Sequence, residues 1–166
     1  ELFIINTANS GLITLNTLPL AFKYADKEKG KSTIGNLMIQ LNGSSLIPME
    51  TLDVVCKVIE NMNVVLKQIV PGLTIGVVNL GNELFPDGKR GSKIQLVSCK
   101  NNREIPLQYE SEGIKKIISI LQLLIVVYNK ASITVAIDEI DSGVFEYLLG
   151  ELLRIISEKG KGQLIF

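Results

Sequence analysis

The spacing of apolar and polar positions changes several times along the chain, and each change indicates a different element. Apolar side chains recur at helical spacing between residues 52 and 70, where Pro71-Gly72 ends the pattern. Shorter apolar runs bounded by Gly, Pro, Asn and Asp are typical of strands and turns. The predicted elements, in order, are strands or loops over 1–47, a helix over 52–70, strands over 73–80 and 92–100 with turns at 81–83 and 86–91 between them, a hairpin turn at 101–102 into 104–107, a helix over 112–129, a strand over 132–138, a helix over 144–158 and a strand over 163–166.

The last third of the chain alternates helices and strands. This succession is the pattern of a parallel sheet with right-handed crossovers. The strands before it are joined by short turn-forming segments, which predict antiparallel pairing instead. We therefore expect an α/β fold with a partly parallel sheet flanked by helices, plus an antiparallel hairpin region.

The strand predicted at 132–138 runs directly into three acidic residues, Asp138, Glu139 and Asp141. An unpaired carboxylate is too costly to bury in the middle of a strand, so these side chains are expected where the strand leaves the sheet. Open α/β folds bind ligands at this edge. Carboxylates presented there suit Mg²⁺, which is held by one or two carboxylates plus substrate phosphates. The alternative is a solvated acidic turn that follows an ordinary strand.

A second candidate lies at the start of the helix predicted over 112–129. Ser111 is a typical N-cap residue, and a hydroxyl beside the free N–H groups of a helix start forms an anion site. Gly113 allows a backbone or a phosphate to approach closely despite its poor helix propensity. Taken alone, this pattern is better explained by ordinary helix capping.

Composition narrows the range of functions. The chain has 17 basic and 17 acidic residues, so net charge gives no case for binding nucleic acid or an anionic membrane. The absence of histidine excludes any histidine-based triad, metal ligand or general base. Cys56 and Cys99 are far apart and are expected to be free thiols of a cytoplasmic protein. The longest apolar run, 117–128, is shorter than the roughly 20 residues that span a membrane.

The order of the two candidate features resembles the second half of an ATP-binding cassette. The chain is similar to the ABC/SMC-like ATPases, and among them to the stand-alone bacterial AAA-family ATPases. The resemblance implies that residues 110–116 form a degenerate signature motif with Ser111 and Gly113 at its matching positions. It also implies that residues 133–139 are the Walker B strand and that residues 141–143 are the D-loop.

The same resemblance assigns roles to individual residues. Asp138 would be the magnesium-site residue, and Glu139 would be the catalytic carboxylate that polarises the attacking water. Ser111 and Gly113 would contact the γ-phosphate of ATP held by the other copy in a head-to-tail homodimer, whose interface Asp141 would cross. ATP and Mg²⁺ are therefore the implied cofactors. DNA or a fused effector domain are partners that the resemblance allows in the parent protein.

Two parts of the family's site are not found in the chain, the Walker A loop and the His switch. The stretch nearest to a Walker A loop, residues 29–33, has Ala25 where the first glycine belongs and no apolar strand before it. Residues 23–33 are therefore expected to be a solvated charged loop. The chain starts without Met and stops within an apolar stretch, so we expect an internal fragment of a larger P-loop NTPase fold. Residues 1–70 would be a variable, lid-like segment, and 71–166 the C-terminal lobe.

Two other functions remain open. The first is a non-catalytic scaffold or protein-interaction domain with a degenerate cassette. The second, a phosphoacceptor domain of the receiver type, is less favoured because such domains need acids on an early strand and a later lysine. The ATPase hypothesis requires the strand over 132–138 to be central, with 163–166 beside it. A scaffold allows that strand to lie at an edge.

Overall fold

The computed structural model describes residues 2–5, 17–26, 31–101, 103–137, 140–141 and 144–166, and the part of the chain that it describes is a mixed α/β fold. Its helices are α1 (Leu52–Ile69), α2 (Glu112–Asn129) and α3 (Glu146–Lys159), with short 3₁₀ turns η1 (Met49–Thr51) and η2 (Leu107–Tyr109). Its strands are β1 (Leu2–Ile5), β2 (Thr17–Asp26), β3 (Lys31–Gln40), β4 (Ser44–Pro48), β5 (Thr74–Leu84), β6 (Arg90–Lys100), β7 (Arg103–Pro106), β8 (Thr134–Ile137) and β9 (Gln163–Ile165). None of these helices combines the length and the apolar content needed to cross a bilayer.

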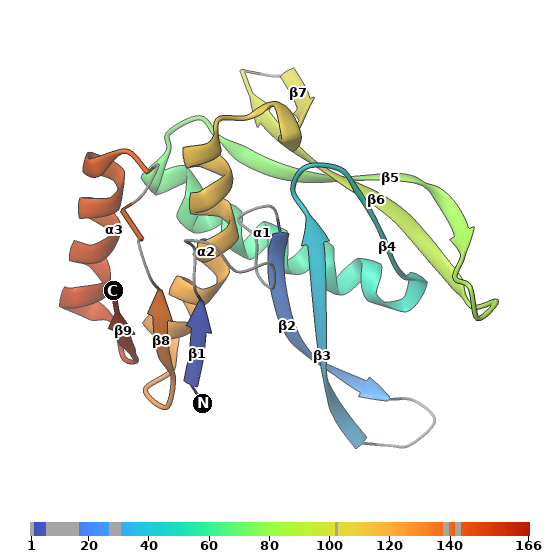
Figure 1. The fold of residues 1–166 in the computed structure, drawn as a ribbon, viewed down its shortest axis with the longest axis horizontal. Coiled ribbons are helices and arrows are strands. Elements are labelled where there is room, and N and C mark those ends of the chain that lie inside the picture. The colour runs from blue at the N-terminus through green and yellow to red at the C-terminus, as the bar shows by residue number, and fades with distance from the viewer. Residues whose placement is uncertain (1, 6–16, 27–30, 102, 138–139, 142–143) are drawn as a thin grey trace.

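The strand β8 lies in the middle of a three-stranded sheet with the order β1-β8-β9. Both of its pairings are parallel: Leu2 of β1 is opposite Thr134, and Thr134 is opposite Gln163 of β9. Helix α3 connects β8 to β9, as parallel neighbours require a crossover. Figure 1 shows this small sheet beside α2, with α3 on its outer side.

The remaining strands pair in antiparallel fashion. Strands β2 and β3 form one two-stranded sheet, and β4, β6 and β5 form another, with β7 also pairing with β6. Strands β5 and β6, of 11 residues each, form a hairpin whose turn lies at the far side of the molecule from α2 and α3 (Figure 1). These pairings confirm the mixed α/β class and the antiparallel hairpin region expected from the sequence.

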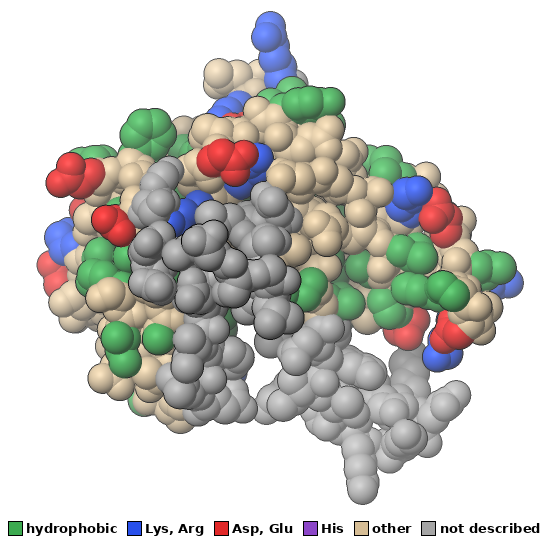
Figure 2. Space-filling view, viewed as in Figure 1, with side chains coloured by type: hydrophobic (Ala, Val, Ile, Leu, Met, Phe, Trp, Pro, Cys, Tyr) green, Lys and Arg blue, Asp and Glu red, His purple; other side chains and the backbone are tan. Residues whose placement is uncertain are grey.

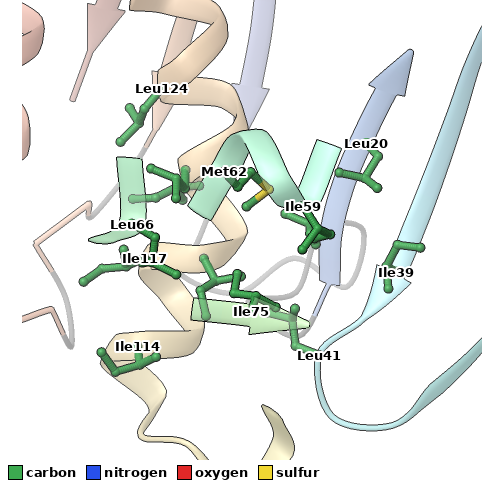
Figure 3. Close-up of a cluster of buried hydrophobic side chains, with 14 of the residues drawn as sticks. Leu20, Ile39, Leu41, Ile59, Met62, Leu66, Ile75, Ile114, Ile117 and Leu124 are labelled. Atoms are coloured by element: carbon green, nitrogen blue, oxygen red, sulfur yellow. The ribbon is translucent and has the colours of Figure 1, made fainter. Parts of the chain in front are cut away.

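One apolar core joins the helices to the strands. Met62 and Leu66 of α1 and Ile117 of α2 are completely buried, and β2 and β3 contribute Leu20 and Ile39 at 1% exposure each. Figure 3 shows these side chains converging between the two helices and the sheets. The apolar faces predicted from helical spacing in α1 and α2 are therefore the faces that pack into the core.

Helix α1 also secures the edge of the antiparallel sheet. The side-chain amide of Asn63 accepts a hydrogen bond from the backbone N–H of Ile75, at 2.7 Å, and donates one to the backbone oxygen of Ile75, at 2.8 Å. Ile75 belongs to β5, which ends the strand order β4-β6-β5. The two bonds satisfy backbone groups that a further strand would otherwise pair, which fixes the helix against this edge.

Two expectations for loops and turns were wrong. Residues 23–26 and 31–33 are strand, because β2 and β3 continue through them as a regular antiparallel ladder. Residues 27–30 lie outside the described part of the chain. The expected turn at 81–83 is instead part of β5, where the register shifts between Asn79 and Gly81 and Gly81 adopts a φ of 127°. A bulge of this kind accommodates polar, turn-forming residues without ending the strand.

The last strand also differs from expectation. The apolar residues of 163–166 favour a buried strand, but β9 lies at one edge of its sheet; Ile165 is 51% exposed, and Phe166, which follows the strand, is 67% exposed. Apolar composition alone did not distinguish an edge position from a central one.

Candidate functional site

The start of α2 presents a capped and partly exposed helix end. Ser111 has extended backbone angles (φ −61°, ψ 151°), and its hydroxyl oxygen accepts a long hydrogen bond of 3.4 Å from the N–H of Ile114. Its backbone oxygen accepts the N–H of Lys115 at 3.1 Å, which begins the helical ladder. Ser111 is exposed, whereas Gly113 is buried in the first turn. The N-cap role predicted for Ser111 is therefore confirmed, and its hydroxyl lies at the positive end of the helix dipole.

Glu110, the residue before this cap, is anchored to strand β6. Its side chain is only 8% exposed. One carboxylate oxygen accepts the hydroxyl of Ser98 at 2.7 Å, and the other accepts the ammonium of Lys100 at 3.1 Å. Burial acts to raise the pKa of Glu110, but the hydrogen bonds from Ser98 and Lys100 and the N–H of Ser111 outweigh it, so the pKa is lowered. Glu110 is therefore ionised at neutral pH.

A buried lysine ties the first turn of α2 to a second part of the fold. The side chain of Lys115 is 4% exposed and its ammonium contacts the Glu112 carboxylate at 2.5 Å. The same ammonium donates to the side-chain oxygen of Asn42, at 3.0 Å, in the turn between β3 and β4. A buried cation needs such partners, so the contact holds this turn against the helix start. The next residue, Lys116, is also buried, at 2% exposure.

The acidic turn after β8 is only partly described. Val135 and Ile137 of β8 are buried, at 0% and 1% exposure, and Ile140 is buried at 3% exposure. Asp141 is exposed and its backbone oxygen accepts the N–H of Val144 at 3.3 Å.

Two of the predicted site residues, Asp138 and Glu139, lie outside the described residues. Within the part that is described, no three Asp, Glu or Cys side chains gather into a group that could hold a metal ion. The predicted magnesium site at Asp138 and the catalytic role of Glu139 therefore stay predictions.

The topology orients β8 relative to α2. After α2 ends, the chain reverses at 130–133 and β8 runs back alongside the helix. Strand β8 accordingly points toward the end of the helix layer where α2 starts (Figure 1). This arrangement follows from a short helix-to-strand connection, which makes neighbouring elements run in opposite directions.

Three contacts at this end were missed from the sequence. Glu110 had no assigned role, because nothing local links it to Ser98 and Lys100. These two residues are spaced two apart on one strand, which is the one available signal that they share a face. The contact between Lys115 and Asn42 joins residues far apart in the chain and carries no such signal.

Comparisons with known proteins identify no family. No family model matches the chain, and no curated protein matches it. One solved structure with some similarity is the Smc head domain with a coiled coil and joint derived from Pyrococcus yayanosii. It shares 15% sequence identity with this chain at a TM-score of 0.45, over 70% of this chain and 22% of that one. A likeness of this size assigns neither a fold family nor a function to the chain.

Proposed function

We propose that this chain is the signature and Walker B part of an ABC/SMC-like ATPase domain. In the proposal, Ser111 and Gly113 contact the γ-phosphate of ATP that the Walker A loop of a second copy holds. Asp138 helps to hold Mg²⁺, Glu139 polarises the attacking water, and Asp141 lies in the turn that crosses between the two copies. The chain alone, without a phosphate-binding loop, neither binds ATP tightly nor hydrolyses it.

The observation that carries the proposal is the position of β8. It is the middle strand of a parallel sheet, and β9 is its neighbour, which is the arrangement that the ATPase hypothesis requires. Ligands of open α/β sheets bind beyond the carboxyl ends of such strands. The acidic stretch Asp138 to Asp141 follows this end of β8 directly.

The start of α2 supplies a second, independent support. Ser111 presents an exposed hydroxyl at a helix N-terminus, where backbone N–H groups and the helix dipole favour a phosphate. Strand β8 points toward this end of the helix (Figure 1). A triphosphate bound between two copies would contact the start of α2 from one copy and the acidic residues after β8 from the other.

The chemistry of the donor set suits the proposed cofactors. Carboxylate oxygens are the ligands that Mg²⁺ takes in proteins, and Asp138 provides one directly after a rigid strand. Phosphoryl transfer asks the protein mainly for positioning and for stabilisation of charge. Glu139 would orient a water molecule, while the hydroxyl and N–H groups at the start of α2 would stabilise negative charge on the phosphate.

The nearest Walker A candidate does not supply a phosphate loop. A Walker A lysine and hydroxyl must follow a glycine-rich loop and open a helix. Lys31, Ser32 and Thr33 instead pair with Asp26, Ala25 and Tyr24 in the β2–β3 ladder. This pairing favours the proposal that ATP is held by a Walker A loop elsewhere.

Partners belong to the same proposal. The two copies would assemble head to tail, and DNA or a fused effector domain would engage the parent protein. On the face shown in Figure 2, the Lys and Arg side chains of the described residues are interspersed with Asp and Glu. Nucleic-acid binding depends on gathered basic residues. The chain as a whole has 17 basic and 17 acidic residues, and we propose that any DNA contact is made by other segments of the parent protein.

The decisive experiment measures ATP turnover in a polypeptide that contains this chain together with a Walker A loop. Glu139→Gln keeps the shape of the side chain but removes the base, so turnover should fall by about 10²–10⁴-fold while ATP binding is retained. The control is Glu146→Gln, which changes an exposed glutamate in the first turn of α3 and should leave turnover unchanged.

Two results would overturn the proposal. The first is equal turnover in the Glu139→Gln variant and in the control. The second is robust, Glu139-dependent hydrolysis by the 166-residue chain alone. If ATP is neither bound nor hydrolysed in any form, a non-catalytic scaffold with a degenerate cassette becomes the better description.

A further inference from the structure

We infer that Glu110 is a positioning residue that couples strand β6 to the phosphate-facing Ser111 at the start of α2. The inference rests on the proposed function for its consequence in ATP chemistry. Its structural part, the coupling of Ser111 to β6 through Glu110, stands on contacts of the described residues and is testable separately.

The carboxylate of Glu110 is held at both oxygens. One accepts the hydroxyl of Ser98 at 2.7 Å and the other accepts the ammonium of Lys100 at 3.1 Å. Both donors belong to β6, and Ser98 is itself 1% exposed. Two separate donors fix the rotation of the carboxylate plane as well as its place. A hydrogen bond between charged groups is the stronger kind, although the Lys100 side chain is 44% exposed, so water reaches that partner.

The backbone on either side of Ser111 is fixed in turn. The N–H of Glu110 donates to the oxygen of Leu107 at 3.0 Å, and Leu107 is completely buried. The backbone N–H of Ser111 is a hydrogen-bond donor that helps to lower the pKa of the Glu110 carboxylate. The hydroxyl oxygen of Ser111 accepts the N–H of Ile114. Ser111 therefore sits between an anchor on the sheet and the first turn of its helix. A shift of β6 would move the Ser111 hydroxyl with it.

The neighbouring glutamate serves as an internal contrast. Glu112 also flanks Ser111, but its side chain is 74% exposed and it pairs with Lys115 of its own helix. Helix capping and the helix dipole favour an acid at either position. They do not explain why Glu110 turns inward to two donors of a different element. A positioning role explains the inward orientation of the Glu110 side chain.

The structural part is tested by an NMR pH titration of the 166-residue chain. The amide signal of Ser111 should titrate together with the Glu110 carboxyl, at a midpoint below the ordinary 4.5 of glutamate. Glu110→Gln should remove this titration. Glu83→Gln removes the charge from an exposed 2.8 Å ion pair between Glu83 of β5 and Lys93 of β6, and should leave the titration in place. A Ser111 amide that does not titrate, or that titrates equally in the Glu110→Gln variant, would overturn the inference.

The functional part uses ATP turnover in the polypeptide that also carries a Walker A loop. Glu110→Gln should lower kcat/KM for ATP by about 10-fold or more, since small displacements of a positioned group are costly in rate. Glu83→Gln should change kcat/KM by less than about twofold. Equal values in the two variants would refute the catalytic consequence. Absence of turnover in the unmodified protein would instead refute the proposed ATPase, and the titration would still decide the link between Glu110 and Ser111.

Discussion

The amide clamp from Asn63 to the edge of β5 gives the sharpest prediction on stability. Replacing Asn63 by Ala removes both hydrogen bonds to Ile75, of 2.7 and 2.8 Å, and leaves a backbone N–H and C=O without these partners. Ile75 is 3% exposed, so water has little access to them. Each unsatisfied buried group costs about 1–3 kcal/mol. The free energy of unfolding should therefore fall by about 2–4 kcal/mol, allowing for non-additivity.

The assay is urea unfolding followed by far-UV circular dichroism. Asn61→Ala is the matched control, because Asn61 lies on the same helix but is exposed. Its effect should stay within about 0.5 kcal/mol. Asn63→Asp adds a second test: it keeps an acceptor for the Ile75 N–H but replaces the donor by an oxygen that faces the Ile75 carbonyl. It should be at least as destabilising at neutral pH. Equal stability of the Asn63→Ala and Asn61→Ala variants would refute the reasoning.

Three further predictions concern the core, the glycines and pH. Met62→Ala should lower the free energy of unfolding by about 2–5 kcal/mol, because Met62 is completely buried. Met38 is 45% exposed, so Met38→Ala should lower it by less than about 1 kcal/mol, and similar urea midpoints for the two variants would contradict this. Gly162→Ala should lower Tm, because a Cβ there would lie 2.7–2.9 Å from three backbone oxygens. Gly150→Ala, on α3 with open space around it, should raise the free energy of unfolding by about 0.5–1 kcal/mol. A higher Tm for Gly162→Ala than for Gly150→Ala in a calorimetric scan would refute the packing argument. Because the pKa of Glu110 is lowered on folding, its stabilising contribution is present above the ordinary 4.5 and is lost as pH falls through the lowered value. The acid-side fall in urea midpoints should therefore be smaller in the Glu110→Gln variant than in the unmodified chain; the pKa values of Asp87 and Glu151 are also lowered, so part of the fall should remain.

The helices were the most predictable elements because their signals are local. Helix α2 begins and ends at the predicted residues, since a capping serine precedes it and Asn129 ends its apolar pattern. Helix α1 differs from the prediction by its last residue alone. Regularly spaced apolar residues and a capping residue are both recognised from residues that lie close together in the sequence.

Strand pairing could not be predicted in the same way. Residues 23–33 carry Lys, Asp and Glu in close succession, which favoured a loop, yet β2 and β3 form a ladder through most of them. Pairing stabilises such strands through backbone bonds that composition does not reveal. The pairing of β1 with β8 also has no local signal, because it joins segments from distant parts of the sequence.

In the candidate site, too, local features were predictable and contacts between distant segments were not. The cap role of Ser111 was predictable from its place before an apolar run. The anchoring of Glu110 was not, because the hairpin predicted at 101–102 does not by itself show which side chains of β6 face the start of α2; Ser98 and Lys100 do so. A contact between residues of two different elements cannot be predicted until the way those elements pack together is known.

The central position of β8 has a consequence for how the chain folds. Its neighbour β9 follows after one helix, whereas β1 comes from residues 2–5 and must close a very long loop to reach it. Loop closure costs entropy, and contacts between distant residues slow folding. We therefore expect α2, β8, α3 and β9 to assemble first and β1 to dock last. On the ribosome, β1 is synthesised long before its partner, so until β8 emerges it is a bare apolar segment that chaperones or neighbouring nascent chains can capture.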